Sequence, residues 1–198
     1  MPTLFHSPNS RSSSMVALID ELDADVDIVE VTIRRQDGSG GPDARNPHPE
    51  KKVPFLINGD DSIRERGAIT VYLTDMFPKA RMAPLPGEPG RGDYLSWLFY
   101  YQGVMEPVIL LHWAQLDHPV LQGSLGSLPA VTDRLSGALQ DRAFLLGDRY
   151  SAADLLCSSP FIWLPDLLPD DQAIRDWVHR CRERPATVRM AERDARAR

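Results

Sequence analysis

Glu65, Arg66 and Gly67 stand at the expected start of a helix, where side chains and backbone could bind an anion together. From Ala68 the apolar residues recur along one helix face, namely Ile69, Tyr72, Leu73, Met76 and Phe77. The first amide groups of a helix have no partner inside it, and the helix dipole is positive at that end. This pattern therefore predicts a site for a carboxylate ligand.

A short hairpin must position this helix. Residues 53–57 form an apolar run typical of a strand, and Asn58-Gly59 after it favours a tight turn into a second strand around Ser62. Pro54 cannot donate a ladder hydrogen bond, so it belongs at the beginning or edge of this strand. We expect a cis Val53-Pro54 bond that turns the backbone of Lys52 and Val53 outward.

The preceding elements complete a small mixed sheet. Thr3–His6 reads as a strand, a helix follows to about Leu22, and Val26–Ile33 alternates like a second strand. A strand, a crossover helix and a second strand make a parallel pair. After an irregular segment, the hairpin and its helix give the order β-α-β then β-β-α. The sequence thus predicts an α/β thioredoxin-like domain over residues 1–77.

Several motifs occur in the order seen in one family: Asn46-Pro47, Lys52-Val53-Pro54, the hairpin, Glu65-Arg66-x-Ala68-Ile69 and Tyr72-Leu73. Together they resemble the glutathione-binding half of soluble, bacterial-like glutathione transferases. The resemblance implies glutathione as co-substrate, held by the backbone at Lys52, Val53 and Pro54 and by the acidic Glu65. Arg66 stands where this family usually has Ser or Thr, and its guanidinium could pair with the γ-glutamyl carboxylate as a fork.

The resemblance also places a thiol-activating residue in the turn before the first helix, which here contains Ser10, Arg11 and Ser12. The thiol of glutathione reacts as a thiolate, and an ordinary cysteine thiol has a pKa near about 8.5. A hydroxyl or amide donor at a helix N-terminus stabilises that anion. The turn has neither the Tyr nor the Cys of other classes and resembles the serine type. Ser10 is the first candidate, then Ser12 and Arg11; alternatively, Ser10 only caps the helix.

A second domain follows a linker rich in Pro and Gly over residues 78–90. Residues 91–198 show helical periodicity without strand signals, and Pro107 interrupts the first helix. Ser151-Ala152-Ala153-Asp154 forms a capping box and resembles the folding signature of the same family. The sequence therefore predicts an all-helical C-terminal domain.

The electrophile would bind in a cleft next to the helix that follows the linker. Four side chains there are candidates for the pocket, or alternatively for the core: Tyr100, Tyr101, Glu106 and Trp113. His6, inside the first strand, is interpreted as structural. The other histidines have no metal-ligand spacing, so we expect no metal site.

Composition narrows the classes of function. The net charge is −6, which offers no overall basic field for nucleic acid or an anionic membrane. Cys157 and Cys181 lie in expected helices and fit buried, reduced thiols better than a disulfide. There is no apparent secretory signal and no apolar stretch long enough for a membrane span, so we expect a cytoplasmic protein.

The sequence therefore predicts a glutathione S-transferase that adds the glutathione thiolate to a small hydrophobic electrophile. The resemblance implies a role in detoxification and a homodimer with the helices at 68–77 and 91–105 in the contact. Three alternatives stay open: a non-catalytic glutathione-binding or interaction module with the same fold, a glutathione-dependent peroxidase or dehalogenase, and a disulfide reductase. The last is disfavoured because no cysteine lies near the first helix.

Overall fold

The computed structural model describes residues 1–197, which form two compact units. The first comprises Met1–Ala80 together with the chain from Pro185, and the second comprises Arg81–Arg184. The domain boundaries predicted from the sequence placed everything after residue 90 in one helical domain. The structure divides the end of the chain differently, because the last helix packs on the first unit. Arg198, the final residue of the predicted helical domain, lies outside the described residues.

The first unit is built on a four-stranded mixed sheet. Its strands are β1 (Thr3–His6), β2 (Asp27–Glu30), β3 (Phe55–Asn58) and β4 (Asp61–Ile63), in the order β2-β1-β3-β4. β1 and β2 are parallel and linked through α1 (Ser13–Glu21), whereas β3 pairs antiparallel with β1 and with β4. The predicted thioredoxin-like fold class is thereby confirmed.

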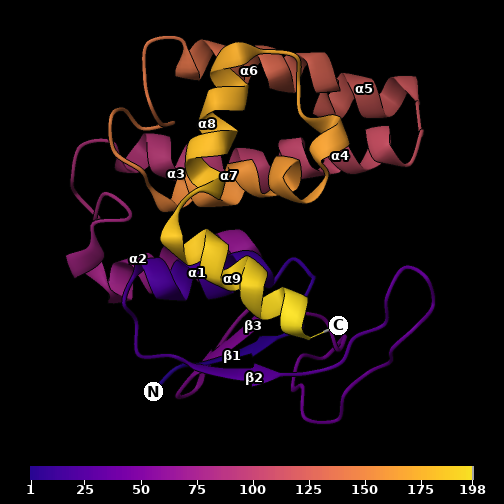
Figure 1. Ribbon diagram of the computed structural model, residues 1–198, viewed down its shortest axis with the longest axis vertical. Helices are drawn as coiled ribbons and strands as arrows, with labels where there is room; N and C mark the ends of the chain where they lie inside the picture. The colour runs from indigo at the N-terminus through magenta and orange to yellow at the C-terminus, as the bar shows by residue number, and fades with distance from the viewer. Residues whose placement is uncertain (198) are drawn as a thin grey trace. The chain divides into compact units, whose positions relative to one another are not determined.

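Three helices pack with this sheet: α1, α2 (Arg66–Met76) and α9 (Pro185–Arg196). They lie on the same side of the sheet in Figure 1, where α9 runs alongside α1. The core beneath them is apolar and includes fully buried side chains from the sheet and from α1 and α2, namely Leu4, Met15, Leu18, Leu56, Ile69 and Leu73. This burial explains the helical and strand periodicities in the sequence.

The second unit is helical. Its helices are α3 (Arg91–Tyr100), α4 (Glu106–Trp113), α5 (Pro119–Leu125), α6 (Leu128–Leu139), α7 (Ala152–Trp163) and α8 (Gln172–Arg182). The predicted interruption at Pro107 takes the form of a π-helical turn, Tyr101–Met105, between α3 and α4. A proline removes one backbone N–H and crowds the preceding turn, which such a widened turn relieves.

The capping box at the start of α7 connects several elements of the second unit by hydrogen bonds. The Ser151 side chain accepts from the backbone three residues on, and the Asp154 carboxylate reaches back to the Ser151 amide at 2.9 Å. Asp154 also accepts from the Leu145 amide at 2.8 Å and from the indole N–H of Trp177 in α8 at 2.9 Å. One carboxylate thus joins the α7 start, the preceding loop and α8.

Candidate functional site

The turn between β1 and α1 contains a compact hydroxyl cluster. The Ser10 hydroxyl lies 2.7 Å from the Ser7 carbonyl oxygen, to which it can donate, and 2.7 Å from the Ser12 hydroxyl. Ser10 Oγ also accepts at 3.1 Å from the amide of Ser12, which is the N-cap residue of α1. Ser10 is partly exposed whereas Ser12 is fully buried, so only the Ser10 hydroxyl can reach a ligand.

Beneath this cluster lie two residues that the sequence analysis did not connect. His6 Nδ1 is 2.8 Å from Ser12 Oγ, and His6 Nε2 faces Asp194 Oδ1 at 3.6 Å. Asp194 belongs to α9, 188 positions after His6. Its other oxygen accepts from the Ser13 hydroxyl at 2.5 Å and from the Asn9 amide at 2.9 Å. The far end of the chain therefore lines the floor of the turn.

The guanidinium of Arg35 holds the same turn from the segment after β2. It donates to the carbonyl oxygens of Asn9 at 2.9 Å and Pro8 at 2.7 Å, and to the Ser7 hydroxyl at 3.1 Å. Asn9 has φ of 54°, a left-handed conformation that Asn adopts more readily than most residues. No periodicity or motif predicted this clamp, because Arg35 lies in an irregular segment.

The loop before β3 has the predicted special geometry. The Val53-Pro54 peptide bond is cis, which confirms that prediction. Asn46 braces the loop, because its side-chain amide donates to the Lys52 carbonyl oxygen at 3.0 Å and its Oδ1 accepts from the His48 amide at 3.0 Å. Lys52 itself is largely exposed and pairs with Glu50 at 2.5 Å.

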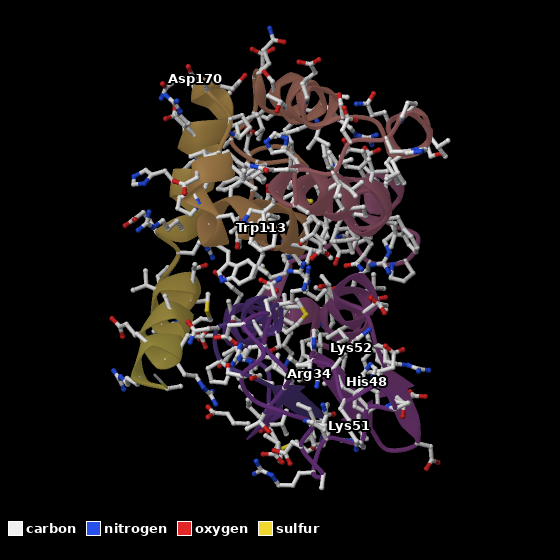
Figure 2. All side chains as sticks on the ribbon, turned by 90° about the vertical axis from the view of Figure 1, so that its right-hand side faces the viewer. Arg34, His48, Lys51, Lys52, Trp113 and Asp170 are labelled. Carbon is white, nitrogen blue, oxygen red and sulfur yellow. The ribbon has the colours of Figure 1, made fainter. Side chains whose placement is uncertain are left out.

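His48 is a structural member of this loop. Its Nδ1 accepts from the Glu50 amide at 3.0 Å, and its ring packs edge-on against Phe55 with centroids 5.2 Å apart. Burial lowers the pKa of His48, so the ring is neutral near pH 7. Figure 2 shows His48, Lys51 and Lys52 on the loop that leads into β3, in the lower part of the view.

Glu65 and Arg66 sit at the N-terminus of α2, as predicted. Glu65 is exposed and has φ of 66° and ψ of 129°, a combination that costs a residue other than glycine about 1–3 kcal/mol. Such strain is typical of functional positions. Arg66 is buried, and its guanidinium lies 3.5 Å from the Ser14 hydroxyl in α1. Arg66 therefore connects the N-terminal turns of α1 and α2.

The four candidate pocket residues have different environments in the second unit. Tyr101 is fully buried in the core, whereas Trp113 at the end of α4 has 48% of its surface exposed. Tyr100 is partly exposed, and the guanidinium of Arg134 stacks over its ring at 3.9 Å. Glu106 is half-buried at the first position of α4. The pocket assignment for these residues stays a prediction.

Other chemistries have less support. Cys157 and Cys181 form no disulfide and are buried, and burial raises the pKa of Cys181 well above its usual range. Within residues 1–197 no three His, Cys, Asp or Glu side chains are grouped to hold a metal ion. No helix in that range has the length and apolarity to cross a bilayer. A hollow between α1 and α9, with Val16, Ile19 and Met190 among its lining residues, contains no predicted site residue.

Comparison with curated proteins gives relatives below 30% identity. No family model matches the chain. The disulfide-bond oxidoreductase YfcG of Escherichia coli K12 is 25% identical, over 94% of this chain and 93% of its own. Glutathione S-transferase 1 of Schizosaccharomyces pombe is 28% identical over 162 residues, which cover 76% of this chain and 69% of that protein. Both similarities span the two units.

Solved structures share the fold over nearly the whole chain. A glutathione transferase from Methylococcus capsulatus has a TM-score of 0.80 at 24% identity, covering 98% of this chain and 99% of its own. A sphingomonad glutathione S-transferase in complex with glutathione has a TM-score of 0.76 at 23% identity, covering 98% of both chains. The chain therefore has the glutathione transferase fold. Family membership and activity are therefore treated below as proposals.

Proposed function

We propose that this protein is a glutathione transferase that adds the glutathione thiolate to a small hydrophobic electrophile. The observation that carries the proposal is the partly exposed Ser10 hydroxyl at the N-terminus of α1, in a fold shared with glutathione transferases. A hydroxyl that donates to sulfur stabilises the thiolate more than the thiol, so it lowers the thiol pKa. Each unit of that shift corresponds to about 1.4 kcal/mol.

Glutathione would bind along the exposed edge of the first unit. In this proposal the backbone at Lys52 and Val53, next to the cis Pro54, binds the cysteinyl part of glutathione. The γ-glutamyl end lies at the N-terminus of α2, where Glu65 pairs with its amino group. Arg66 and the N-terminal end of α2 then favour the γ-glutamyl carboxylate.

Ser10 is the residue that we propose contacts sulfur. Ser12 is fully buried, so its hydroxyl acts on Ser10 rather than on the ligand. Arg11 is exposed beside them and adds positive charge to the turn. On binding, the Ser10 hydroxyl turns from its contacts inside the turn, the Ser7 carbonyl oxygen and the Ser12 hydroxyl, toward the sulfur.

The second unit would supply the surface for the electrophile. Tyr100, Glu106 and Trp113 are the candidates with side-chain surface to offer, whereas Tyr101 supports them from the core. We also propose that the protein forms a homodimer, as the resemblance implies.

A second candidate function is glutathione-dependent disulfide reduction, which the similarity to the E. coli oxidoreductase favours. The two cysteines of this chain are buried within α7 and α8 and are unsuited to exchange. All three sulfurs of the exchange, namely the attacking thiolate, the attacked sulfur and the leaving thiol, would then belong to glutathione and its disulfide substrate.

Turnover assays separate these functions. Glutathione binding is measured by titration calorimetry, and turnover is measured with chloronitrobenzene, an organic hydroperoxide, a haloalkane and a mixed disulfide of glutathione. We expect conjugation of the chloronitrobenzene, and we expect Ser10→Ala to lower it about 10- to 100-fold near neutral pH, as one lost donor would. Turnover of the mixed disulfide alone would favour the second candidate. Binding without any turnover would favour a non-catalytic module.

A further inference from the structure

We propose that the glutathione thiol passes its proton inward through Ser10 and Ser12 to His6, whose charged form Asp194 stabilises from α9. We call Ser10, Ser12, His6 and Asp194 the proton relay. This inference rests on the proposed function and deepens it, because it assigns the destination of the thiol proton. His6 and Asp194 do not touch glutathione, so they act as positioning residues.

The relay is continuous within the first unit. Ser10 Oγ lies 2.7 Å from Ser12 Oγ, Ser12 Oγ lies 2.8 Å from His6 Nδ1, and His6 Nε2 lies 3.6 Å from Asp194 Oδ1. His6 and Ser12 are fully buried, whereas Ser10 reaches the surface. The line therefore leads from a ligand-accessible hydroxyl to a buried base.

The charge on Asp194 fixes the direction of the hydrogen bonds. Burial alone would raise the pKa of the Asp194 carboxyl, but the nearby His6 ring and hydrogen bonds from Ser13 and the Asn9 amide outweigh that effect and lower it. Asp194 is thus ionised at neutral pH. A carboxylate facing Nε2 favours the tautomer with the proton on Nε2, which leaves the Nδ1 lone pair toward Ser12.

The relay uses the arrangement in which Ser10 and Ser12 donate inward rather than to the Ser7 carbonyl oxygen, which lies 2.7 and 3.2 Å from their hydroxyl oxygens. Ser12 donates to His6 Nδ1 and accepts from the Ser7 amide at 3.1 Å. Its second lone pair accepts from Ser10, whose hydroxyl proton points inward and whose free lone pair points outward. In this state Ser10 presents an acceptor to the incoming thiol.

Ionisation of the thiol then balances without any further reactant. The S–H proton moves to Ser10 Oγ, the Ser10 proton moves to Ser12 Oγ, and the Ser12 proton moves to His6 Nδ1. The products are a thiolate that accepts from the new Ser10 hydroxyl and an imidazolium beside the Asp194 carboxylate. A buried imidazolium needs such a partner, since an isolated buried charge is strongly disfavoured.

Docking of α9 does not account for the whole environment of Asp194. The bonds of its Oδ2 to Ser13 and the Asn9 amide are structural, but its Oδ1 faces His6 instead. An acidic residue in the last turn of a helix is opposed by the helix dipole, yet Asp194 is buried there. Two other ion pairs already link α9 to its neighbours. Arg189 donates to both carboxylate oxygens of Asp20 in α1, at 2.7 and 2.9 Å, and Arg193 donates to Glu30 in β2 at 2.8 Å.

The charged groups around the relay are the two ion pairs of α9 and the guanidinium of Arg35. Glu30 ends β2 and is paired with Arg193 of α9, while Arg35 holds the turn through Ser7 and two carbonyl groups. On α1, the hydroxyl of Ser13 contacts Asp194, and Asp20 is paired with Arg189. The arginines stay charged at all accessible pH values, so they cannot receive the thiol proton.

The test combines nitrogen NMR of His6 with the pKa of the bound thiol. In the wild type, free of ligand, we expect His6 as the Nε2-protonated tautomer; with glutathione bound and ionised, both ring nitrogens should carry protons. Asp194→Asn should raise the bound thiol pKa, read from thiolate ultraviolet absorbance, by about one unit. It should lower conjugation near pH 7 about 10- to 100-fold and leave glutathione affinity at low pH unchanged.

Arg189→Gln is the matched control, because it removes an α1–α9 link without touching the relay. If Arg189→Gln shifts the thiol pKa as much as Asp194→Asn does, docking of α9 is responsible and the relay is refuted. A neutral His6 in a complex whose thiol is ionised also refutes it, whatever the variants do. Failure of the wild type to bind glutathione overturns the proposed function and the relay together, whereas binding with an unshifted thiol pKa in Asp194→Asn overturns the relay alone.

Discussion

Asp154→Ala should strongly destabilise the helical unit without affecting the first. The buried carboxylate accepts four hydrogen bonds, from the Leu145 amide, the Ser151 amide and hydroxyl, and the Trp177 indole. Removing an acceptor leaves each buried donor with a cost of about 1–3 kcal/mol. The Ser151 hydroxyl can turn elsewhere, so three donors lose their partner.

The charge on Asp154 reduces the expected loss. Burial raises the pKa of this carboxyl and the four donors oppose that rise, so its ionised form already has a desolvation cost. Three unpaired donors would together cost about 3–9 kcal/mol. We expect the free energy of unfolding to fall by about 3–5 kcal/mol, in the lower part of that range, which is also the usual cost of breaking a buried charged pair.

The assay can isolate this unit because all four tryptophans lie within it, namely Trp97, Trp113, Trp163 and Trp177. Urea unfolding followed by tryptophan fluorescence reports the second unit, and far-ultraviolet circular dichroism reports both. Trp177→Phe and the double variant complete a cycle, with an expected coupling of about 1–2 kcal/mol. A loss below about 1 kcal/mol, or no coupling, would show that the box does not hold α7 to α8.

Three further predictions concern the first unit and the assembly. Glu65→Ala should weaken glutathione binding by about 1.5–3 kcal/mol in titration calorimetry, whereas Asp60→Ala in the exposed hairpin should not; equal affinities would remove Glu65 from the site. Light scattering should give a dimer of the 22.2 kDa chain, and Phe99→Asp should produce monomer, because Phe99 on α3 is 75% exposed; a monomeric wild type would contradict this. Because the pKa of Asp194 is lowered in the folded state, its carboxylate stabilises the fold above about pH 4, and this stabilisation is lost as the pH falls through the folded-state pKa. The difference in unfolding free energy between the wild type and Asp194→Asn, measured by urea unfolding, should therefore disappear at low pH. A difference that persists at low pH would contradict this prediction.

Local patterns were enough to predict most of the fold. Residues 53–57, Asn58-Gly59 and the periodic positions after Ala68 located β3, the hairpin turn and α2. On α2 the predicted face is buried at Ile69 and Leu73, whereas Met76 is 37% exposed. The helix α5 was not predicted, because it has no buried residue and hence no periodic face. The strand at 26–33 is shorter than its apolar alternation, since β2 pairs only with the four residues of β1.

Only those parts of the candidate site that depend on neighbouring residues in the sequence could be predicted. Ser10, Pro54 and Glu65 lie next to turns and helix starts, which the local residue pattern predicts. His6, Arg35 and α9 were not connected to it, because tertiary packing alone brings them together.

That separation affects how the thiol site is held. The exposed pairs of α9 with α1 and β2 are each worth about 1 kcal/mol or less, so apolar packing must supply most of the docking energy. The buried carboxylate of Asp194 instead fixes the position of α9 on α1, because its bonds to Ser13 and the Asn9 amide form in only one register of the two helices. The final turn of the chain thus fixes the geometry of the turn after the first strand, and the chemistry proposed for Ser10 depends on both ends of the protein.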